Sequence, residues 1–238
     1  MLLTKPSIIL APRWPSGETS ATGECYVTRG GYFNPPPSNP PSPSPPPPSP
    51  PPAPTHRCTI NITNLDYLFF DTDFNLDISG WFVGSVTTMI GTFELNSEFN
   101  QPLNDWDVSK VESFYDLFRS SLGFNQALNS WSTSNVTYMR GMFRDAESFN
   151  QPLNEWPTGS VTDMRGMFRG ATAFNQALNE WSTGSVTSML AMFRDSLMNQ
   201  DLSSWCVEKI PFKPLRFGND NGTNPVWGSC PSAAPSDA

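Results

Sequence analysis

The chain has 238 residues and a formal net charge of −8, and charged residues make up only 15% of it. This acidic balance argues against nucleic acid as the main partner, because phosphate binding needs a surplus of Lys and Arg. No run of 18 apolar residues occurs, so no membrane-spanning segment is expected.

The N-terminal part divides into two segments. Residues 1–34 carry no interpretable motif, and their start, MLLTKPSIILAP, is a poor secretory signal because Pro6 leaves only a short apolar core. Residues 35–55 are a Pro/Ser-rich linker or stalk, and fourteen of the 25 prolines lie there. Most of these positions lack an N–H, so the segment is expected to be extended polyproline II or a disordered spacer. Its composition resembles the Ser-Pro runs of hydroxyproline-rich cell-wall glycoproteins.

An internal repeat begins after the linker. The tryptophans that mark it are separated by 25, 25, 25, 25 and 24 residues, and they are Trp81, Trp106, Trp131, Trp156, Trp181 and Trp205. A Phe column and a Val column keep the same interval. A fixed period of this length predicts stacked units that cannot fold singly.

Each unit offers signals for a short strand and a short helix. In the unit after Trp156, residues 160–163 predict a very short strand. Met164, Met167, Phe168 and Ala171 then follow at i, i+3, i+4 and i+7, which is the spacing of one helix face.

Both ends of the repeat region, residues 56–231, carry cap signals. Residues 62–69 form a degenerate half-repeat suited to an N-terminal cap, and residues 232–238 are expected to be a disordered tail. Four cysteines allow three pairings; we interpret Cys206 and Cys230 as a disulfide that fixes a C-terminal cap. Whether Cys25 pairs with Cys58 stays open.

The units MFRDAESFNQPLNEWPTGSVTDM and MFRGATAFNQALNEWSTGSVTSM resemble the repeat of BspA-like leucine-rich-repeat surface proteins, and the C-terminal WCVEKIPFKP is similar to the family's end. With the local signals, this resemblance implies an α/β repeat fold. We expect a right-handed leucine-rich-repeat-like solenoid of about six 25-residue units, each a short strand plus a short helix. The resemblance also implies surface display, adhesion or partner binding, and it brings no catalytic residues.

Two columns admit both a structural and a binding interpretation. An Asn follows the aromatic or Met column of every unit, and we interpret this column as an internal ladder that hydrogen-bonds turn backbone, with an amide-rich, sugar-binding stripe as the alternative. The ladder residues are Asn75, Asn100, Asn125, Asn150, Asn175 and Asn199. The tryptophans are interpreted as a stacked core, with exposed sugar-stacking rings as the alternative.

Arginines form the candidate ligand site. One column comprises Arg119, Arg144, Arg169 and Arg194, and Arg140 and Arg165 precede two of its members by four residues. The structural interpretation is a solvated face neutralised by Asp116, Asp145, Asp163 and Asp195. The functional one is a cationic stripe suited to uronate or sulfate groups of polysaccharides.

No catalytic or metal site is expected, because His56 is the only histidine, and no cofactor is expected. A recurring acid before Trp, at Asp105, Glu155 and Glu180, is interpreted as a solvated column rather than a paired-acid site. Candidate glycosylation sites are Asn61, Asn135 and Asn221, and with the even cysteine count they favour an extracellular or cell-wall location. The expected function is adhesion or binding of a surface protein or polysaccharide; the alternative is a structural wall or surface-layer component. Ligand identity and oligomeric state do not follow from the sequence.

Overall fold

The computed structural model describes residues 8–9, 28–29 and 62–231. The chain divides into two compact units, Met1–Ile60 and Asn61–Ala238. In the first unit, β1 (Ile8–Ile9) pairs with β2 (Thr28–Arg29) in antiparallel orientation, with Ile8 opposite Arg29. The expected Pro-rich stalk, the C-terminal tail, Cys25, Cys58 and Asn61 lie outside the described residues.

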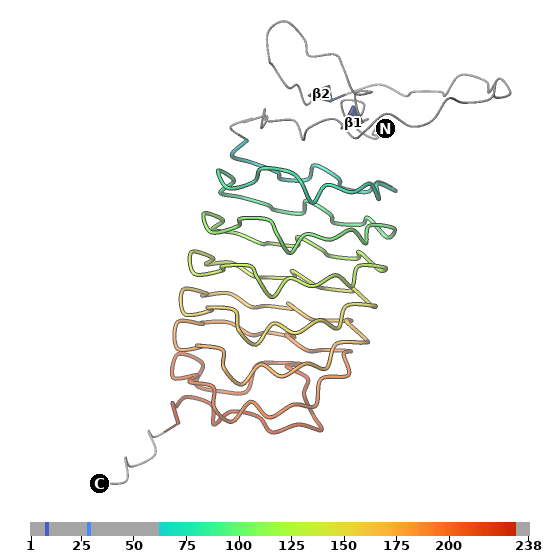
Figure 1. Cartoon of the computed structure of the whole chain (residues 1–238). Helices are drawn as coiled ribbons and strands as arrows, with labels where there is room; N and C mark the ends of the chain where they lie inside the picture. Colours follow the sequence, from blue (N-terminus) through green and yellow to red (C-terminus); the bar gives the residue numbers. More distant parts are fainter. Residues whose placement is uncertain (1–7, 10–27, 30–61, 232–238) are drawn as a thin grey trace, which may run out of the picture. The chain divides into compact units, whose positions relative to one another are not determined.

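The second unit is a stack of coils, which Figure 1 shows as successive turns of similar outline. Neighbouring coils are joined by parallel bridges of one residue each. The bridged residues run in the order Asn64, Thr88, Ser113, Tyr138, Asp163 and Ser188. The first bridge joins residues 24 apart and the other four join residues 25 apart, so the 25-residue repeat of the sequence is the repeat of the stack.

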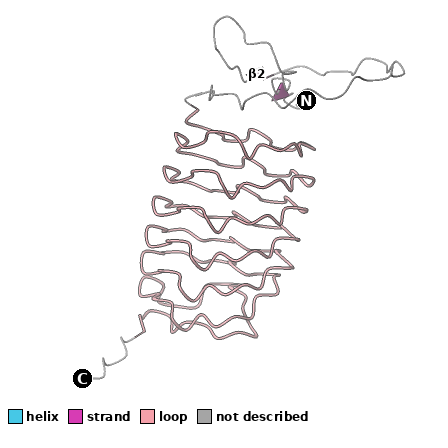
Figure 2. Cartoon of the chain, in the orientation of Figure 1, coloured by secondary structure: helices cyan, strands magenta, loops and turns pink. Residues whose placement is uncertain are grey.

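The prediction of an α/β leucine-rich-repeat-like solenoid, with a short strand and a short helix in each unit, is wrong. Within residues 62–231 the structure contains no helix, and turns and loops make up the stack (Figure 2). The strand expected at 160–163 is reduced to a single bridging residue, Asp163. The residues expected on one helix face are nevertheless all fully buried: Met164, Met167, Phe168 and Ala171.

A ribbon of consecutive turns takes the place of the helix. The N–H groups of Met139, Gly141 and Phe143 donate to carbonyls of the next coil, at 2.9–3.0 Å. The alternate N–H groups of Met142, Arg144 and Ala146 donate to the carbonyl three residues earlier in their own coil. Gly141 and Asp145 have φ values of 63° and 55°, which match the third position of type II turns.

The spacing of the coils explains why no helix forms. An α-helix is about 10 Å wide with its side chains, whereas parallel bridged chains lie about 4.8 Å apart. Equivalent rings are correspondingly close, and the centroids of Phe143 and Phe168 are 5.6 Å apart. Left-handed residues in each ribbon also break the continuous right-handed φ that a helix requires.

Aromatic columns fill the interior of the stack. Phe149 and Phe174 stack at 6.0 Å, and within one coil the Phe143 and Phe149 rings stack at 3.9 Å. The Trp column lies beside them, with Trp131 and Trp156 at 6.3 Å. The core is therefore continuous from coil to coil and holds the outer side chains in register.

The last coil is covered by residues 206–230, which Cys206 and Cys230 close with a disulfide. Phe217 is buried here, and its ring meets Phe193 edge-on at 5.4 Å. The N–H of Val207 donates to the carbonyl of Ser229 at 2.8 Å, so both ends of the covering segment are joined.

Candidate functional site

Five of the six candidate arginines surround one cavity of about 300 Å³ on the turn ribbons. We call this cavity the arginine groove; its basic lining consists of Arg119, Arg140, Arg144, Arg165 and Arg169. The sixth candidate, Arg194, is not part of the lining. The structure thus brings together side chains from three successive coils that the sequence places in two columns.

The bottom of the groove follows from backbone conformation. Gly141, Gly166 and Ala191 hold equivalent places in three coils, and each has a φ between 55° and 63°. Glycine adopts this left-handed conformation without steric cost, so two of the three places carry no side chain. The small residues leave the space that the longer arginine side chains surround.

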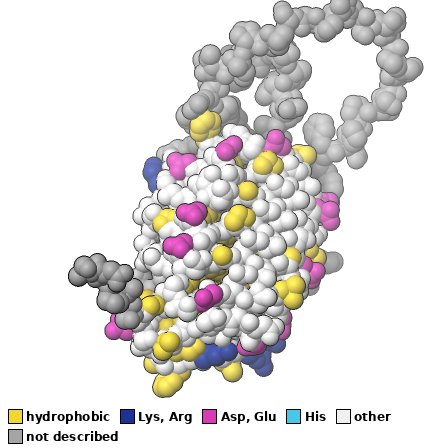
Figure 3. All heavy atoms as spheres, turned by 60° about the horizontal axis from the view of Figure 1, so that its bottom comes forward, with side chains coloured by type: hydrophobic (Ala, Val, Ile, Leu, Met, Phe, Trp, Pro, Cys, Tyr) yellow, Lys and Arg dark blue, Asp and Glu magenta, His cyan; other side chains and the backbone are white. Residues whose placement is uncertain are grey.

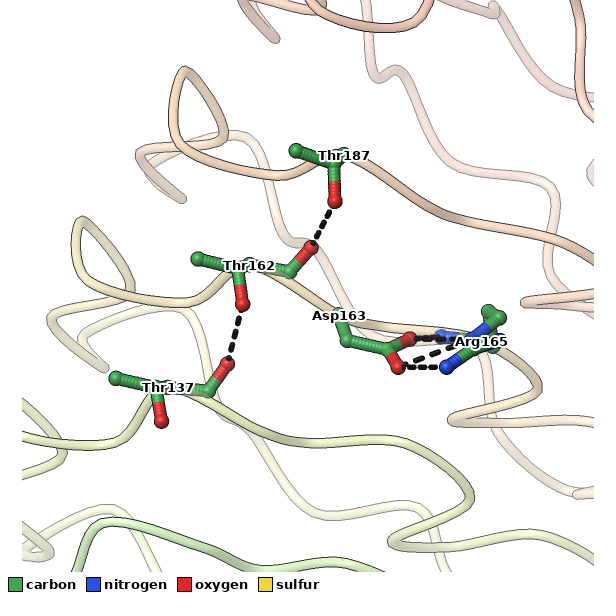
Figure 4. A network of polar contacts seen from close by, with 5 residues as sticks. All are labelled: Thr137, Thr162, Asp163, Arg165 and Thr187. Atoms are coloured by element: carbon green, nitrogen blue, oxygen red, sulfur yellow. Dashed lines mark hydrogen bonds and ion pairs between the residues drawn. The ribbon is translucent and has the colours of Figure 1, made fainter.

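The arginines differ in how they are paired. Arg119 forms ion pairs with Glu94 at 2.7 Å and with Asp116 at 3.7 Å. Arg165 donates from Nε and Nη2 to the Asp163 carboxylate, as Figure 4 shows. The Arg140 guanidinium lies 5.4 Å from the centre of the Tyr115 ring. Within residues 62–231, Arg169 has no ion pair or side-chain hydrogen bond.

Two groove arginines keep a buried donor without an acceptor. The Nε atoms of Arg119 and Arg144 are buried and make no hydrogen bond within the described stack. Asp145 lies 3.4 Å from Arg144 Nε, which is an ion-pair distance but too long for a good N–H hydrogen bond. Buried donors of this kind are usually satisfied, so the acidic residues of the stack do not fully pair these two arginines.

Burial also changes the pKa values of two acidic residues near the groove. Burial raises the pKa of the Asp116 carboxyl above its usual value, while the positive charges of Arg119, Arg144 and Arg140 act in the opposite direction. Burial likewise raises the pKa of Glu94 against the effect of Arg119. The neutralisation expected from Asp116, Asp145, Asp163 and Asp195 is thus uneven, because Arg169 faces no carboxylate partner among them.

Charge is distributed unevenly over the surface as well. On the face shown in Figure 3, acidic side chains lie singly among uncharged ones, and most of the visible Lys and Arg gather at the lower edge. Because the whole chain has a net charge of −8, this gathering of basic side chains is a local feature.

The Asn column runs along the surface of the stack rather than inside it. The N–H of Asn150 donates to Oδ1 of Asn125 at 3.0 Å, and Asn175 repeats this contact with Asn150. Gln151 and Gln176 donate to the same Asn oxygens. All of these side chains are half-buried. The column links neighbouring coils through its side-chain oxygens.

The tryptophans lie in the core from Trp106 onward, with exposures of 0–3%. The indole Nε1 of Trp156 donates to the carbonyl of Leu128 at 2.8 Å, and each later Trp makes the equivalent bond. Sugar stacking on these rings is therefore incompatible with the structure.

The remaining candidates lie apart from the groove. Asn135 and Asn221 are exposed, and Nδ2 of Asn135 already donates to the carbonyl of Ser109 at 2.6 Å. The described residues contain no group of three or more His, Cys, Asp or Glu side chains that could hold a metal ion. They also contain no helix long and apolar enough to cross a membrane.

Sequence reasoning named the arginines but missed what shapes the groove. Gly141 and Gly166 were not among the candidates, although both interrupt the apparent helix at the same place in successive units. A recurring glycine inside a helical pattern is a signal for a special backbone conformation.

Fold and site together define a repeat domain of stacked coils with an arginine-lined groove. Residues 56–156 and 123–219 match the family described as Mycoplasma protein of unknown function, DUF285. These matches cover more than half of the chain, which therefore belongs to this family. No curated protein and no solved structure matches the chain.

Proposed function

We propose that the chain is a BspA-like surface or extracellular repeat protein that binds a protein or polysaccharide partner and has no catalytic activity. Its family membership supports a repeat protein of this general kind. The observation that carries the binding proposal is the arginine groove, where five arginines from three coils line a cavity of about 300 Å³.

The rigid core supports this proposal physically. Stacked rings and inter-coil hydrogen bonds keep the groove residues at fixed separations, so a ligand meets a preorganised row of positive charges. The alternative is a structural wall or surface-layer component, which would need no groove with unpaired donors.

The test is a binding panel with the full chain and immobilised neutral, uronate-bearing and sulfated polysaccharides, together with surface proteins. We expect binding that weakens as salt rises, because exposed charges are screened. Absence of binding to every member would favour the structural alternative. Release of shortened sugars from any polysaccharide would contradict a non-catalytic role.

A further inference from the structure

Asp116 occupies one position of the arginine groove with its own carboxylate. It is one of two left-handed residues in its turn ribbon, with a φ of 50°, and Gly141 is the equivalent residue of the next coil. Oδ1 of Asp116 lies so close over Gly141 that a Cβ there would collide with it. Arg119, Arg140 and Arg144 line the same cavity, and their positive charges act on this carboxyl.

One coil further, the same position is open. Gly141 stands where Asp116 stood, so no side chain extends over Gly166. The nearest atom to a Cβ on Gly166 would be Cβ of Arg169, at 3.8 Å. The matching distance from a Cβ on Gly141 to Cβ of Arg144 is 3.9 Å, so the local turn is alike at the two positions.

The position over Gly166 has arginines at all three equivalent places, but it has no carboxylate equivalent to that of Asp116. Arg144, Arg165 and Arg169 stand 25 residues after Arg119, Arg140 and Arg144, so they are their equivalents in the next unit. Arg169 has no ion pair among the described residues, and the ion pair of Arg144 with Asp145 is long, at 3.4 Å. Arg165 uses Nε and Nη2 on Asp163, which leaves its Nη1 without a hydrogen bond inside the stack.

We propose that the space over Gly166 binds a carboxylate of a ligand between Arg144, Arg165 and Arg169, in the way that Asp116 occupies the space over Gly141. This inference rests on the proposed function and specifies its ligand. A carboxylate suits the site because the protein fills the equivalent position with one, and planar guanidinium groups match its two oxygens.

We assign this carboxylate to a linear polyuronate, because the proposed function is the binding of a polysaccharide and equivalent positions of the groove follow one another along the stack. Equivalent positions follow the stack axis at the coil spacing of about 4.8 Å. A chain of uronic acids carries a carboxylate on every sugar and can lie along the axis.

The experiment measures binding of a polygalacturonate oligomer to the full chain by calorimetry. Arg169→Gln should weaken binding about tenfold or more, because a hydrogen-bonded charge is lost at the site. Arg194→Gln is the matched control from the same column; it lies outside the groove lining and should change affinity less than about twofold. Equal losses in both variants would overturn the proposal.

Asp116→Gly supplies a test that misfolding cannot imitate. Removing the built-in carboxylate opens the position over Gly141, so the oligomer can bind two neighbouring positions and should bind severalfold more tightly. Unchanged or weaker binding by this variant, with an intact melting transition, would contradict the proposal.

Three further results separate this inference from the proposed function. Salt-sensitive binding of a sulfated polysaccharide without binding of polygalacturonate would refute the carboxylate site and leave the proposed function standing. Preference for a poly-glutamate peptide over polygalacturonate would refute the polyuronate assignment. Absence of binding to the whole panel would refute both proposals.

Discussion

The backbone N–H of Asn150 donates to Oδ1 of Asn125, one coil earlier, over 3.0 Å. The Oδ1 of Asn150 in turn accepts from the N–H of Asn175 and from Gln176 Nε2. One side-chain oxygen therefore joins two coils in each unit. Its repetition gives the stack a hydrogen-bonded seam outside the aromatic core.

Asn150→Ala should destabilise the stack by about 1 kcal/mol, because two donors lose a half-buried acceptor that water can partly replace. Thermal unfolding of the variant measures this loss. Asn129→Ala is the matched control, since Asn129 is exposed and its side chain makes no hydrogen bond within the described residues. Equal melting temperatures for wild type and Asn150→Ala would rule out a stabilising seam.

Trp156→Phe should cost about 2 kcal/mol, because it removes buried apolar surface and the hydrogen bond from Nε1 to the Leu128 carbonyl. That carbonyl keeps one bond, from the N–H of Trp131, which limits the loss. Denaturant unfolding measures the difference. The same change at Trp81, which is only half-buried and whose indole N–H has no partner in the described stack, should cost less.

The sequence predicted the period and much of the core. The Phe, Trp and Val columns were visible as fixed intervals, and their members from Phe99, Trp106 and Val86 onward are buried, down to Met198 and Trp205 at the end of the stack. Spacing alone could establish this much, because residues one period apart must face the same environment in any stack.

Local conformation was not determined by the same spacing. Met164, Met167, Phe168 and Ala171 fit one face of a helix, yet a ribbon of alternating turns buries all four as well. The choice between them depends on hydrogen bonds to neighbouring coils, which a single-unit pattern does not contain. The glycines at 141, 166 and 170 were the local evidence against a helix, and the first two also shape the groove.

Protonation of Asp116 should stabilise the stack as pH falls. Burial raises its pKa in the folded state, so the folded protein binds this proton more tightly than the unfolded chain. The stabilisation is fully present below the unfolded pKa and is lost as pH rises through the raised folded pKa. Relative to Asp116→Asn, the wild type should therefore gain stability between pH 7 and about pH 4.

Asp201 gives the control of opposite sign for this pH series. Hydrogen bonds from Ser203 lower its pKa, so its contribution is present above the unfolded pKa and is lost as pH falls. Thermal unfolding of Asp116→Asn and of Asp201→Asn across the pH range, each compared with wild type, measures the two trends. Parallel curves for wild type and Asp116→Asn would show that burial of Asp116 does not perturb its protonation.

Reduction of the Cys206–Cys230 disulfide should destabilise the C-terminal end by about 3 kcal/mol, the loop-closure value for a separation of 24 residues. Cys230 is exposed, so a mild reductant can reach the bond in the folded protein. The melting temperature with and without reductant gives the effect. A Cys206→Ser, Cys230→Ser variant should melt at the reduced wild-type temperature and be insensitive to reductant.

The central structural claim is that 25-residue coils stack through turns and bridges without any helix in residues 62–231. Far-UV circular dichroism of the full chain, recorded through thermal unfolding, tests it most directly. We expect a cooperative transition in which no α-helical double minimum is lost. A pronounced helical double minimum that disappears in that transition would contradict the stack of turns and the groove built on it.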